Sequence, residues 1–279
     1  MRKLFFAIII IMMALVACAK DSGEEYGRQV SVAFLNVGYG DSIIVAVNDK
    51  AYLIDTGSEN SAHSLLRGLS AMDVKKIDGL FLTHADSDHI GGAEVLVQEY
   101  QVDMVYFAEI SEPSKKGKHQ LVQLAEELKL PYTKLNANDV IEVDDEIAFN
   151  VIAPIEYNKA DDNDNSLVLL IELNGIRFLF AGDMQFAGER TILSHGADIG
   201  AHVLKVGNHG NKDATSPLFA EAVSPDYAVI STSTKEDPGS ANKRVLSALS
   251  AARILITESY ENGVKMNVDA GGNISIKGL

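Results

Sequence analysis

The sequence predicts an α+β fold in which two β-sheets pack face to face, with helices on their outer surfaces. Two β-rich blocks indicate the two sheets, one beginning at residue 30 and the other at residue 147. Segments with helical spacing of apolar residues accompany each block and would cover its outer face. The 279 residues, 47% of them hydrophobic, suit a globular core made by one large domain or by two halves packed together.

The first block opens with short β-rich runs that are separated by turn residues, at residues 30–35, 43–47 and 51–54. Runs of this length and spacing are typical of antiparallel strands. Apolar residues then recur at helical spacing in residues 62–72, and again in residues 120–130. Between these two predicted helices, an apolar strand at residues 77–82 precedes a further helix at residues 93–99.

The second block begins with strand-like runs at residues 147–152, 167–173 and 177–181. Asn174-Gly175 joins the last two, and this pair is the strongest hairpin signal in the chain. Strands and helices then alternate, with helices at residues 186–194, 216–223 and 242–249 and strands at residues 202–206 and 227–231. Three last strands are expected near Ile254, Lys265 and Ile274.

The N-terminus is typical of a secreted lipoprotein. Arg2 and Lys3 precede an apolar stretch too short to span a bilayer comfortably, which indicates a signal peptide at residues 1–17. The segment that ends at Cys18 resembles a bacterial lipobox, and Cys18 is the only cysteine in the sequence. We therefore expect Cys18 to be lipidated, residues 18–29 to form a tether, and the protein to be held outside the cytoplasm at the cell membrane. An ordinary signal peptide with an incidental cysteine is the alternative.

The net charge is strongly negative, at −15 for the whole sequence. Removal of Arg2 and Lys3 with the signal leaves 22 basic against 39 acidic residues, a formal charge of −17. Such a surface repels polyanions, which argues against a passive nucleic-acid-binding module. An enzyme that acts on phosphodiesters is still compatible with this charge, because bound metal ions can invert the local potential.

Residues 83–92 contain the densest cluster of metal-binding side chains. His84, Asp86, Asp88 and His89 lie within six positions, immediately after the apolar strand at residues 77–82. Imidazole and carboxylate groups suit zinc, manganese and iron, and a loop that follows a strand can aim several of them at one point. A surface loop could also carry these residues by chance, so the motif alone predicts a metal site without establishing one.

Five motifs follow one another along the chain: FLNVGYGDS at residues 34–42, LIDTG at 53–57, THADSDHIGG at 83–92, NSLVL with AGD at 165–169 and 181–183, and LKVGNHG at 204–210. In this order they resemble metallo-β-lactamase-fold hydrolases, and specifically the metallo-hydrolase domain of ComEC-type DNA-uptake (competence) proteins. Asn36 and Tyr39 depart from the family's FLDVGQGDS. The resemblance implies a four-layer αββα sandwich that spans residues 30–279.

The resemblance also implies a centre of two divalent metal ions. Its ligands would be His84, Asp86, Asp88 and His89 from one loop, Asp183 as the carboxylate between the two ions, and His209. Two such ions lower the pKa of a shared water and polarise the electrophile. Asp88 is the ligand best placed to hold that water and accept its proton. Asp55 would orient a ligand histidine from behind, or would form only a turn at its strand end.

Several positions depart from the superfamily pattern. Asp86 replaces a histidine, and this harder oxygen ligand favours manganese or magnesium over zinc. The histidine of the third motif is absent, and the corresponding stretch is the acidic run at residues 161–166. This run either lends a carboxylate or amide to a loosely held ion or is a solvated loop. Asn208 and Asp237 stand where relatives often have histidine, which removes two imidazoles.

The sequence therefore indicates a metal-dependent hydrolase, with manganese or zinc as its cofactor and a phosphodiester in DNA or a nucleotide as its substrate. Lys205, in the strand that leads to His209, is the residue expected to contact an anionic substrate. Two alternatives remain: hydrolysis of another ester, lactone or lactam, and a catalytically silent extracytoplasmic binding domain that keeps the fold. The membrane, through the lipid anchor, is the other expected partner, and no protein partner can be inferred.

Overall fold

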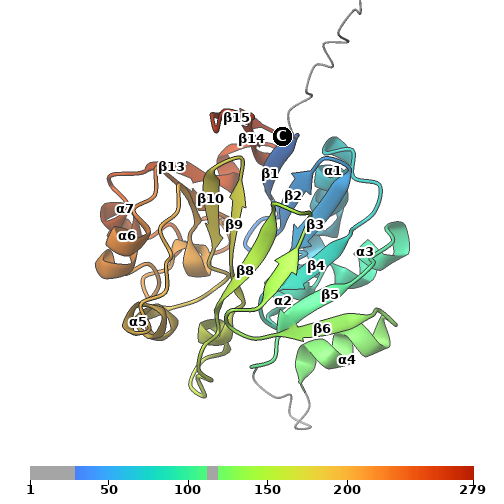
Figure 1. Ribbon diagram of the computed structural model, residues 1–279, viewed down its shortest axis with the longest axis horizontal. Coiled ribbons are helices and arrows are strands. Elements are labelled where there is room, and N and C mark those ends of the chain that lie inside the picture. Colours follow the sequence, from blue (N-terminus) through green and yellow to red (C-terminus); the bar gives the residue numbers. More distant parts are fainter. Residues whose placement is uncertain (1–28, 112–118) are drawn as a thin grey trace, which may run out of the picture.

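The structure, a computed structural model, describes residues 29–111 and 119–279. The predicted signal peptide, Cys18 and nearly all of the predicted tether lie outside these residues. Within them, an eight-stranded and a seven-stranded sheet face each other, and helices cover the outer surface of each (Figure 1). The α+β sandwich expected from the sequence is confirmed.

The first sheet has the strand order β15-β14-β1-β2-β3-β4-β5-β6. Its strands are β1 (Val30–Leu35), β2 (Ile43–Val47), β3 (Lys50–Ile54), β4 (Gly79–Leu82), β5 (Val105–Ala108), β6 (Tyr132–Leu135), β14 (Gly263–Val268) and β15 (Ile274–Gly278). The antiparallel start is confirmed, because β1, β2 and β3 pair antiparallel, whereas β3 to β6 run parallel.

The second sheet has the order β13-β12-β11-β10-β9-β8-β7. Its strands are β7 (Val140–Glu142), β8 (Ala148–Ala153), β9 (Val168–Leu173), β10 (Ile176–Phe180), β11 (Val203–Lys205), β12 (Tyr227–Ile230) and β13 (Arg253–Ile256). The predicted Asn174-Gly175 hairpin joins β9 to β10, and β10 to β13 are parallel.

Two sets of helices complete the four layers. The first sheet is covered by α1 (Ala62–Ala71), α3 (Ala93–Glu99) and α4 (Gln120–Glu127), and the second by α5 (Phe186–Ser194), α6 (Pro217–Val223) and α7 (Lys243–Ala248) (Figure 1). One turn, α2 (Ser87–Ile90), follows β4. No helix in the described ranges is long and apolar enough to cross a membrane.

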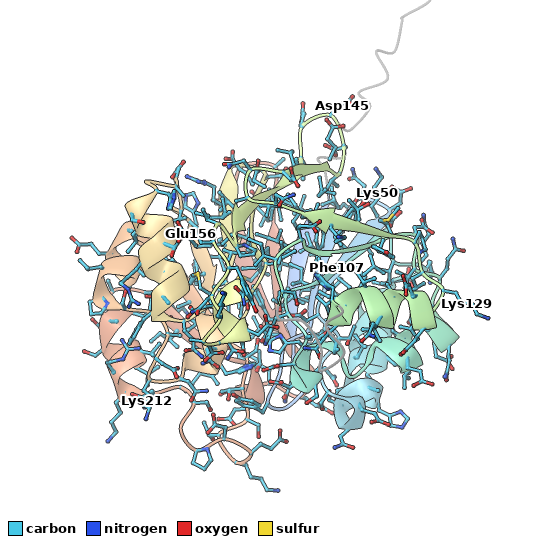
Figure 2. All side chains as sticks on the ribbon, turned by 90° about the horizontal axis from the view of Figure 1, so that it is seen from below. Lys50, Phe107, Lys129, Asp145, Glu156 and Lys212 are labelled. Atoms are coloured by element: carbon cyan, nitrogen blue, oxygen red, sulfur yellow. The ribbon has the colours of Figure 1, made fainter. Side chains whose placement is uncertain are left out.

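Three apolar cores hold the layers together. The central core lies between the sheets and contains the packed rings of Phe81 and Phe149, whose centroids are 4.6 Å apart. The outer cores join each sheet to its helices, as Phe107 does beneath α4. Figure 2 shows Phe107 inside the molecule, while charged side chains such as Lys129 and Lys212 lie at the periphery. Burial of apolar area on both faces of both sheets is the dominant stabilising contribution.

The structure differs from the sequence expectations in three places. Strands β5, β6 and β7 had not been predicted. The predicted helix at residues 120–130 ends at Glu127, because Lys129 adopts a left-handed conformation before Pro131. The last two strands, β14 and β15, return to the first sheet, where β14 pairs with β1, so that sheet combines the two ends of the described chain.

Candidate metal centre

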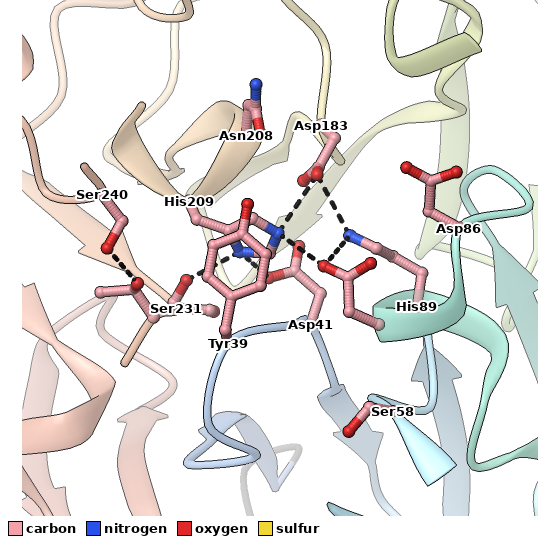
Figure 3. Close-up of polar contacts among 12 residues, drawn as sticks. Tyr39, Asp41, Ser58, Asp86, His89, Asp183, Asn208, His209, Ser231 and Ser240 are labelled. Carbon is pink, nitrogen blue, oxygen red and sulfur yellow. Dashed lines mark hydrogen bonds and ion pairs between the residues drawn. The ribbon is translucent and has the colours of Figure 1, made fainter. Parts of the chain in front are cut away.

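The candidate metal ligands meet at one edge of the sandwich, where parallel strands of both sheets end. Asp55 follows β3, the loop 83–89 follows β4, Asp183 follows β10 and His209 follows β11. Because the carboxyl ends of parallel strands share one edge of a sheet, residues far apart in sequence are brought together there. Figure 3 shows Asp183, His89 and His209 converging from these separate loops.

Asp183 lies at the centre of the group and is almost fully buried. Its backbone N–H donates to Ser166 Oγ at 3.1 Å. The preceding Gly182 has φ +53°, and a Cβ at this position would lie 2.9 Å from the Ser166 Cβ. Only glycine fits this crowded left-handed position without displacing its neighbours, and the sharp turn directs the Asp183 carboxylate to the shared edge.

Four side chains form the more compact half of the site: Asp88, His89, Asp183 and His209, with one potential ligand atom from each lying within 4.8 Å of all the others. Asp183 Oδ2 is 3.2 Å from His89 Nε2 and 3.1 Å from His209 Nε2. Asp88 Oδ2 lies 3.2 Å from His209 Nε2 and 3.7 Å from His89 Nε2. Two imidazoles and two carboxylates around one point make a complete donor set for a divalent ion.

His84 and Asp86 form a sparser half on the other side of Asp183. His84 Nε2 is 4.0 Å from Asp183 Oδ2 and 3.5 Å from Asp86 Oδ2. The Asp86 side chain is 55% exposed, whereas that of His84 is buried. The other five predicted ligands thus surround Asp183 in two unequal sets, one with four donors and one with three when Asp183 is counted in both. Their role as ligands stays a prediction.

Hydrogen bonds behind two of the imidazoles, at Nδ1 of His89 and of His209, turn the Nε2 atom of each ring toward the ligand group. His89 Nδ1 donates to Asp55 Oδ2 at 2.7 Å, and His209 Nδ1 donates to the Ser231 carbonyl at 2.9 Å. Asp55 also accepts hydrogen bonds from the Thr83 backbone N–H and hydroxyl, across 28 residues of sequence. Asp55 therefore connects two loops and orients His89, instead of forming a local turn. Such partners select the tautomer that presents Nε2 to a metal.

The inward-facing ligand atoms lack hydrogen-bond partners. The side-chain atoms concerned are His84 Nε2, His89 Nε2, His209 Nε2 and Asp183 Oδ1, all buried within the described part of the chain. Buried polar atoms normally form hydrogen bonds, so several buried atoms that face one point without a hydrogen bond require an explanation. Divalent cations bound between them would supply it, and the residues present fit the metal centre that the sequence implies.

Charges at the site shift the pKa values of its members in opposite directions. Burial of the His209 ring lowers its pKa, but the carboxylates of Asp183, Asp88 and Asp41 outweigh this effect and raise the pKa to about 9. The pKa of His89 is likewise raised, since Asp183 and Asp55 overcome the burial of its ring. Burial raises the pKa of Asp183, yet the two imidazoles hold it well below its usual range. Without metal, the site is a set of buried ion pairs.

This electrostatic arrangement predicts a pH dependence for the metal-free protein. Because the pKa of folded His209 is about 9 against 6.5 ordinarily, its ion pairs stabilise the fold fully below pH 6.5 and are lost as the pH rises through 9. The melting temperature in EDTA should therefore fall between pH 6.5 and 9. Saturating metal should remove this fall, because a ligating imidazole has already lost its proton.

The test is thermal unfolding with and without EDTA across that range. His209→Gln should flatten the curve in EDTA, whereas His195→Gln, at an exposed helix end, should leave it unchanged. A melting temperature that rises toward pH 9 in the metal-free wild type would contradict the predicted sign.

The prediction that Lys205 contacts substrate is wrong. Its side chain is 0% exposed, and its ammonium pairs with the buried Asp41 carboxylate and donates to the Val206 carbonyl at 2.9 Å. Asp41 in turn has Oδ1 3.7 Å from His209 Nδ1. Burial in the sheet turned this lysine into the counter-ion of an internal carboxylate, so it does not reach the mouth of the site.

The acidic run at residues 161–166 is solvated only at its start, where Asp161 is exposed, and none of its residues belongs to the ligand group. Asp164 is buried, and its Oδ1 accepts from the backbone N–H groups of Gln185 and Gly188 at the start of α5. A carboxylate here also complements the positive end of the helix. Asn165 is likewise buried, and it bonds Asn158 through both of its amide atoms. The run therefore anchors the segment before Asp183.

The two positions that lack the family's histidines point elsewhere. Asn208 Nδ2 donates to Asp213 Oδ1, and Asp237 Oδ1 accepts from the Gly239 backbone N–H. Asn208 and His209 both have positive φ, a conformation that Asn tolerates better than most residues. This left-handed turn directs the His209 ring inward while the Asn208 amide turns away (Figure 3).

Three residues at the site had been assigned no role from the sequence. Asp41 and Tyr39 belong to the quoted segment 34–42, and Ser231 follows β12. The Tyr39 ring lies 4.2 Å from the His209 ring, centroid to centroid. For Asp41 the segment's resemblance was an available signal, whereas the Ser231 contact uses a backbone carbonyl, which has no sequence signature.

Comparisons with known proteins agree with this architecture. Residues 35–234 match the sequence model of a protein family, the metallo-beta-lactamase superfamily. The chain is 30% identical over 275 residues to ComE operon protein 3 of Bacillus subtilis, covering 91% of this chain and 34% of that protein. It is 29% identical over 228 residues to competence protein ComA of Neisseria gonorrhoeae, and this match covers 80% of this chain and 30% of that protein. The chain thus spans about a third of the length of these relatives.

A solved structure has the same fold at low sequence identity. The metallo-beta-lactamase fold protein YhfI from Bacillus subtilis superposes with a TM-score of 0.56 at 13% identity, covering 86% of this chain and 99% of that one. At this identity, the likeness concerns the fold alone.

Proposed function

Because the chain belongs to the metallo-β-lactamase superfamily, we propose that it is a metal-dependent hydrolase that cleaves phosphodiester bonds in DNA or nucleotides. One observation carries the proposal: a buried carboxylate, Asp183, lies between two sets of donors whose imidazole Nε2 atoms are buried without a hydrogen bond. This arrangement suits two divalent ions that share one ligand.

The residues divide the ligation between two positions. Asp88, His89 and His209 would hold one ion and His84 and Asp86 the other, with Asp183 shared. Two metal ions held there would supply a lowered pKa for a bound water molecule and positive charge for the attacking and leaving oxygens of a displacement at phosphorus. Manganese is the preferred ion in this proposal, because three carboxylates among six ligands favour a harder cation than zinc.

Asp88 is the residue proposed to accept the proton of the attacking water. Its side chain is 21% exposed, so it is the member of the compact set that reaches solvent. Burial raises the pKa of Asp88, but the close contact with the His209 ring, 3.2 Å away, and the charge of His89 keep it below the ordinary value. The carboxylate is therefore ionised at neutral pH and able to accept a proton. Asp55 holds His89 in place while this occurs.

The relatives of this chain support the proposed substrate class, whereas its net charge does not. Two relatives that match most of this chain are ComE operon protein 3 and competence protein ComA, and a phosphodiester is the bond that an enzyme acting on DNA would cleave. A net charge of −15 opposes binding of a polyanion, so productive contact depends on cations at the site. Hydrolysis of another ester, lactone or lactam at the same centre would use the same residues.

A catalytically silent binding domain is the second candidate function, and the unequal donor sets favour it. The set of His84, Asp86 and Asp183 has only three members, and Asp86 is 55% exposed. A site that retains one ion in the compact set and none in the other would keep the fold without the two-ion chemistry.

Metal analysis together with an activity screen tests these functions. We expect the purified protein to bind two manganese ions per chain and to hydrolyse DNA or a phosphodiester model substrate. Chelation should abolish this hydrolysis, and manganese should restore more of it than zinc. If the protein hydrolyses only lactones or β-lactams, these compounds and not phosphodiesters are its substrate class. One bound ion and no turnover on any substrate would favour the silent domain.

We also propose that the protein is held outside the cytoplasm by acylation of Cys18, which lies outside the described residues. Support comes from the sequence signal alone. Labelled palmitate should be incorporated into the wild type and not into Cys18→Ser, and an unlabelled wild type released into the medium would oppose the lipid anchor.

A further inference from the structure

We propose that Tyr39 contacts the substrate, and that its hydroxyl group donates a hydrogen bond to an oxygen of the scissile phosphoryl group. This inference rests on the proposed function and adds a residue that does not ligate metal. Three features of the described structure support it: the position of the ring, the way the loop is held, and the direction of the hydrogen bond that the hydroxyl receives.

The ring lies directly beside the compact ligand set. Tyr39 is half-buried, and its ring centroid is 4.2 Å from that of His209. In Figure 3 the hydroxyl end of Tyr39 points to the side on which Asp183 and Asn208 lie. Two other polar side chains near His209 are engaged elsewhere, since Lys205 pairs with Asp41 and Asn208 bonds Asp213.

The loop that carries Tyr39 is fixed to the ligand loop. Gly40, at φ +142°, allows such close approach that an added Cβ would lie 2.4 Å from the Asp88 carbonyl oxygen. The Asp41 backbone N–H donates to the same carbonyl at 3.2 Å. On the other side, the Tyr39 backbone N–H donates to Glu236 Oε2 at 2.9 Å. Tyr39 is thereby positioned relative to Asp88 before any substrate arrives.

The hydroxyl accepts one hydrogen bond and keeps its own donor available. Asn211 Nδ2 donates to the Tyr39 hydroxyl oxygen at 3.2 Å. An amide N–H can only donate, so the phenolic O–H remains available to donate to a bound group. A neutral donor held at the edge of a metal centre suits an oxygen on which negative charge develops during displacement at phosphorus.

Tyr39→Phe tests the inference, because it removes the hydroxyl and keeps the ring against His209. With a phosphodiester substrate we expect kcat to fall roughly 10- to 100-fold, as for loss of a hydrogen bond to a charged group, with manganese content unchanged. Tyr157→Phe, at a residue 40% exposed, is the matched control and should retain full activity. Asn211→Ala should lower kcat in the same direction, and the double variant should lose less than the two changes added together.

A second readout separates this inference from the proposed function. If the wild type hydrolyses no phosphodiester, the proposed function is wrong. The role of Tyr39 is then tested by calorimetry, which measures binding of inorganic phosphate to the manganese-loaded protein. Several-fold weaker phosphate binding by Tyr39→Phe than by wild type and Tyr157→Phe would support the contact. Equal kcat in the first assay, or equal or absent phosphate binding in the second, would overturn it.

Discussion

Asp183→Asn is expected to abolish metal-dependent hydrolysis while leaving the protein folded. The substitution keeps the shape of the side chain and removes the charge that lies 3.1 Å from His209 Nε2 and 3.2 Å from His89 Nε2. Groups that only orient a metal ligand already change metal affinity or activity about 10- to 100-fold when mutated. Loss of the carboxylate between both donor sets should exceed that range, with fewer than two ions bound.

The same variant should change the titration of its neighbour. Asp183 is the principal charge that raises the pKa of His209 to about 9, against the opposing effect of burial. In metal-free Asp183→Asn, the His209 pKa measured by NMR should therefore move down toward its ordinary value. Asp49→Asn, in an exposed turn, is the matched control. Full activity in Asp183→Asn with an unchanged His209 titration would refute the central position of this carboxylate.

Lys205→Met is expected to destabilise the protein more than any surface lysine substitution. It would leave the Asp41 carboxylate, in a residue only 1% exposed, without its counter-ion. Removal of one partner from a buried ion pair typically costs about 3–5 kcal/mol, because the remaining charge stays desolvated. The urea concentration at the midpoint of unfolding should fall accordingly. Activity should fall together with stability, because Asp41 lies beside His209.

Two further variants identify the cause. Asp41→Asn combined with Lys205→Met removes both charges and should recover most of the lost free energy of unfolding. Lys134→Met, whose ammonium pairs with Glu109 at 2.8 Å on the surface, should change stability by less than about 1 kcal/mol. If Lys205→Met lowers the free energy of unfolding no more than Lys134→Met does, the buried pair of Lys205 and Asp41 contributes little to stability.

Much of the fold could be predicted from local pattern. Period-2 and period-3.6 spacing located the strands β1 to β4 and the helices α1, α3 and α5 to α7, since each buries one face against a neighbour. The missed strands β5, β6 and β7 are short, and β6 and β7 have few buried residues, so their apolar signal is weak. The return of β14 and β15 to the first sheet had no local signal, because it depends on which sheet edge remains free to pair.

The chemical character of the site was set by the sequence itself. The ligand types, their clustering in residues 83–89 and the later aspartate and histidine depend only on which side chains follow which strands, and parallel strands then present those ends at one edge. Asp55 was placed correctly for the same reason, because it follows β3, the strand beside β4.

Only the tertiary structure decided which polar groups face the site and which serve the interior. Lys205 and Asp164 appear in the sequence as candidates for substrate and metal, yet one neutralises Asp41 and the other anchors α5. A buried charge must find a partner wherever the fold places it, and that partner is usually distant in sequence. Tyr39 reaches His209 for a related reason: the β1–β2 loop and the loop after β11 come from different sheets and meet only when the two sheets pack.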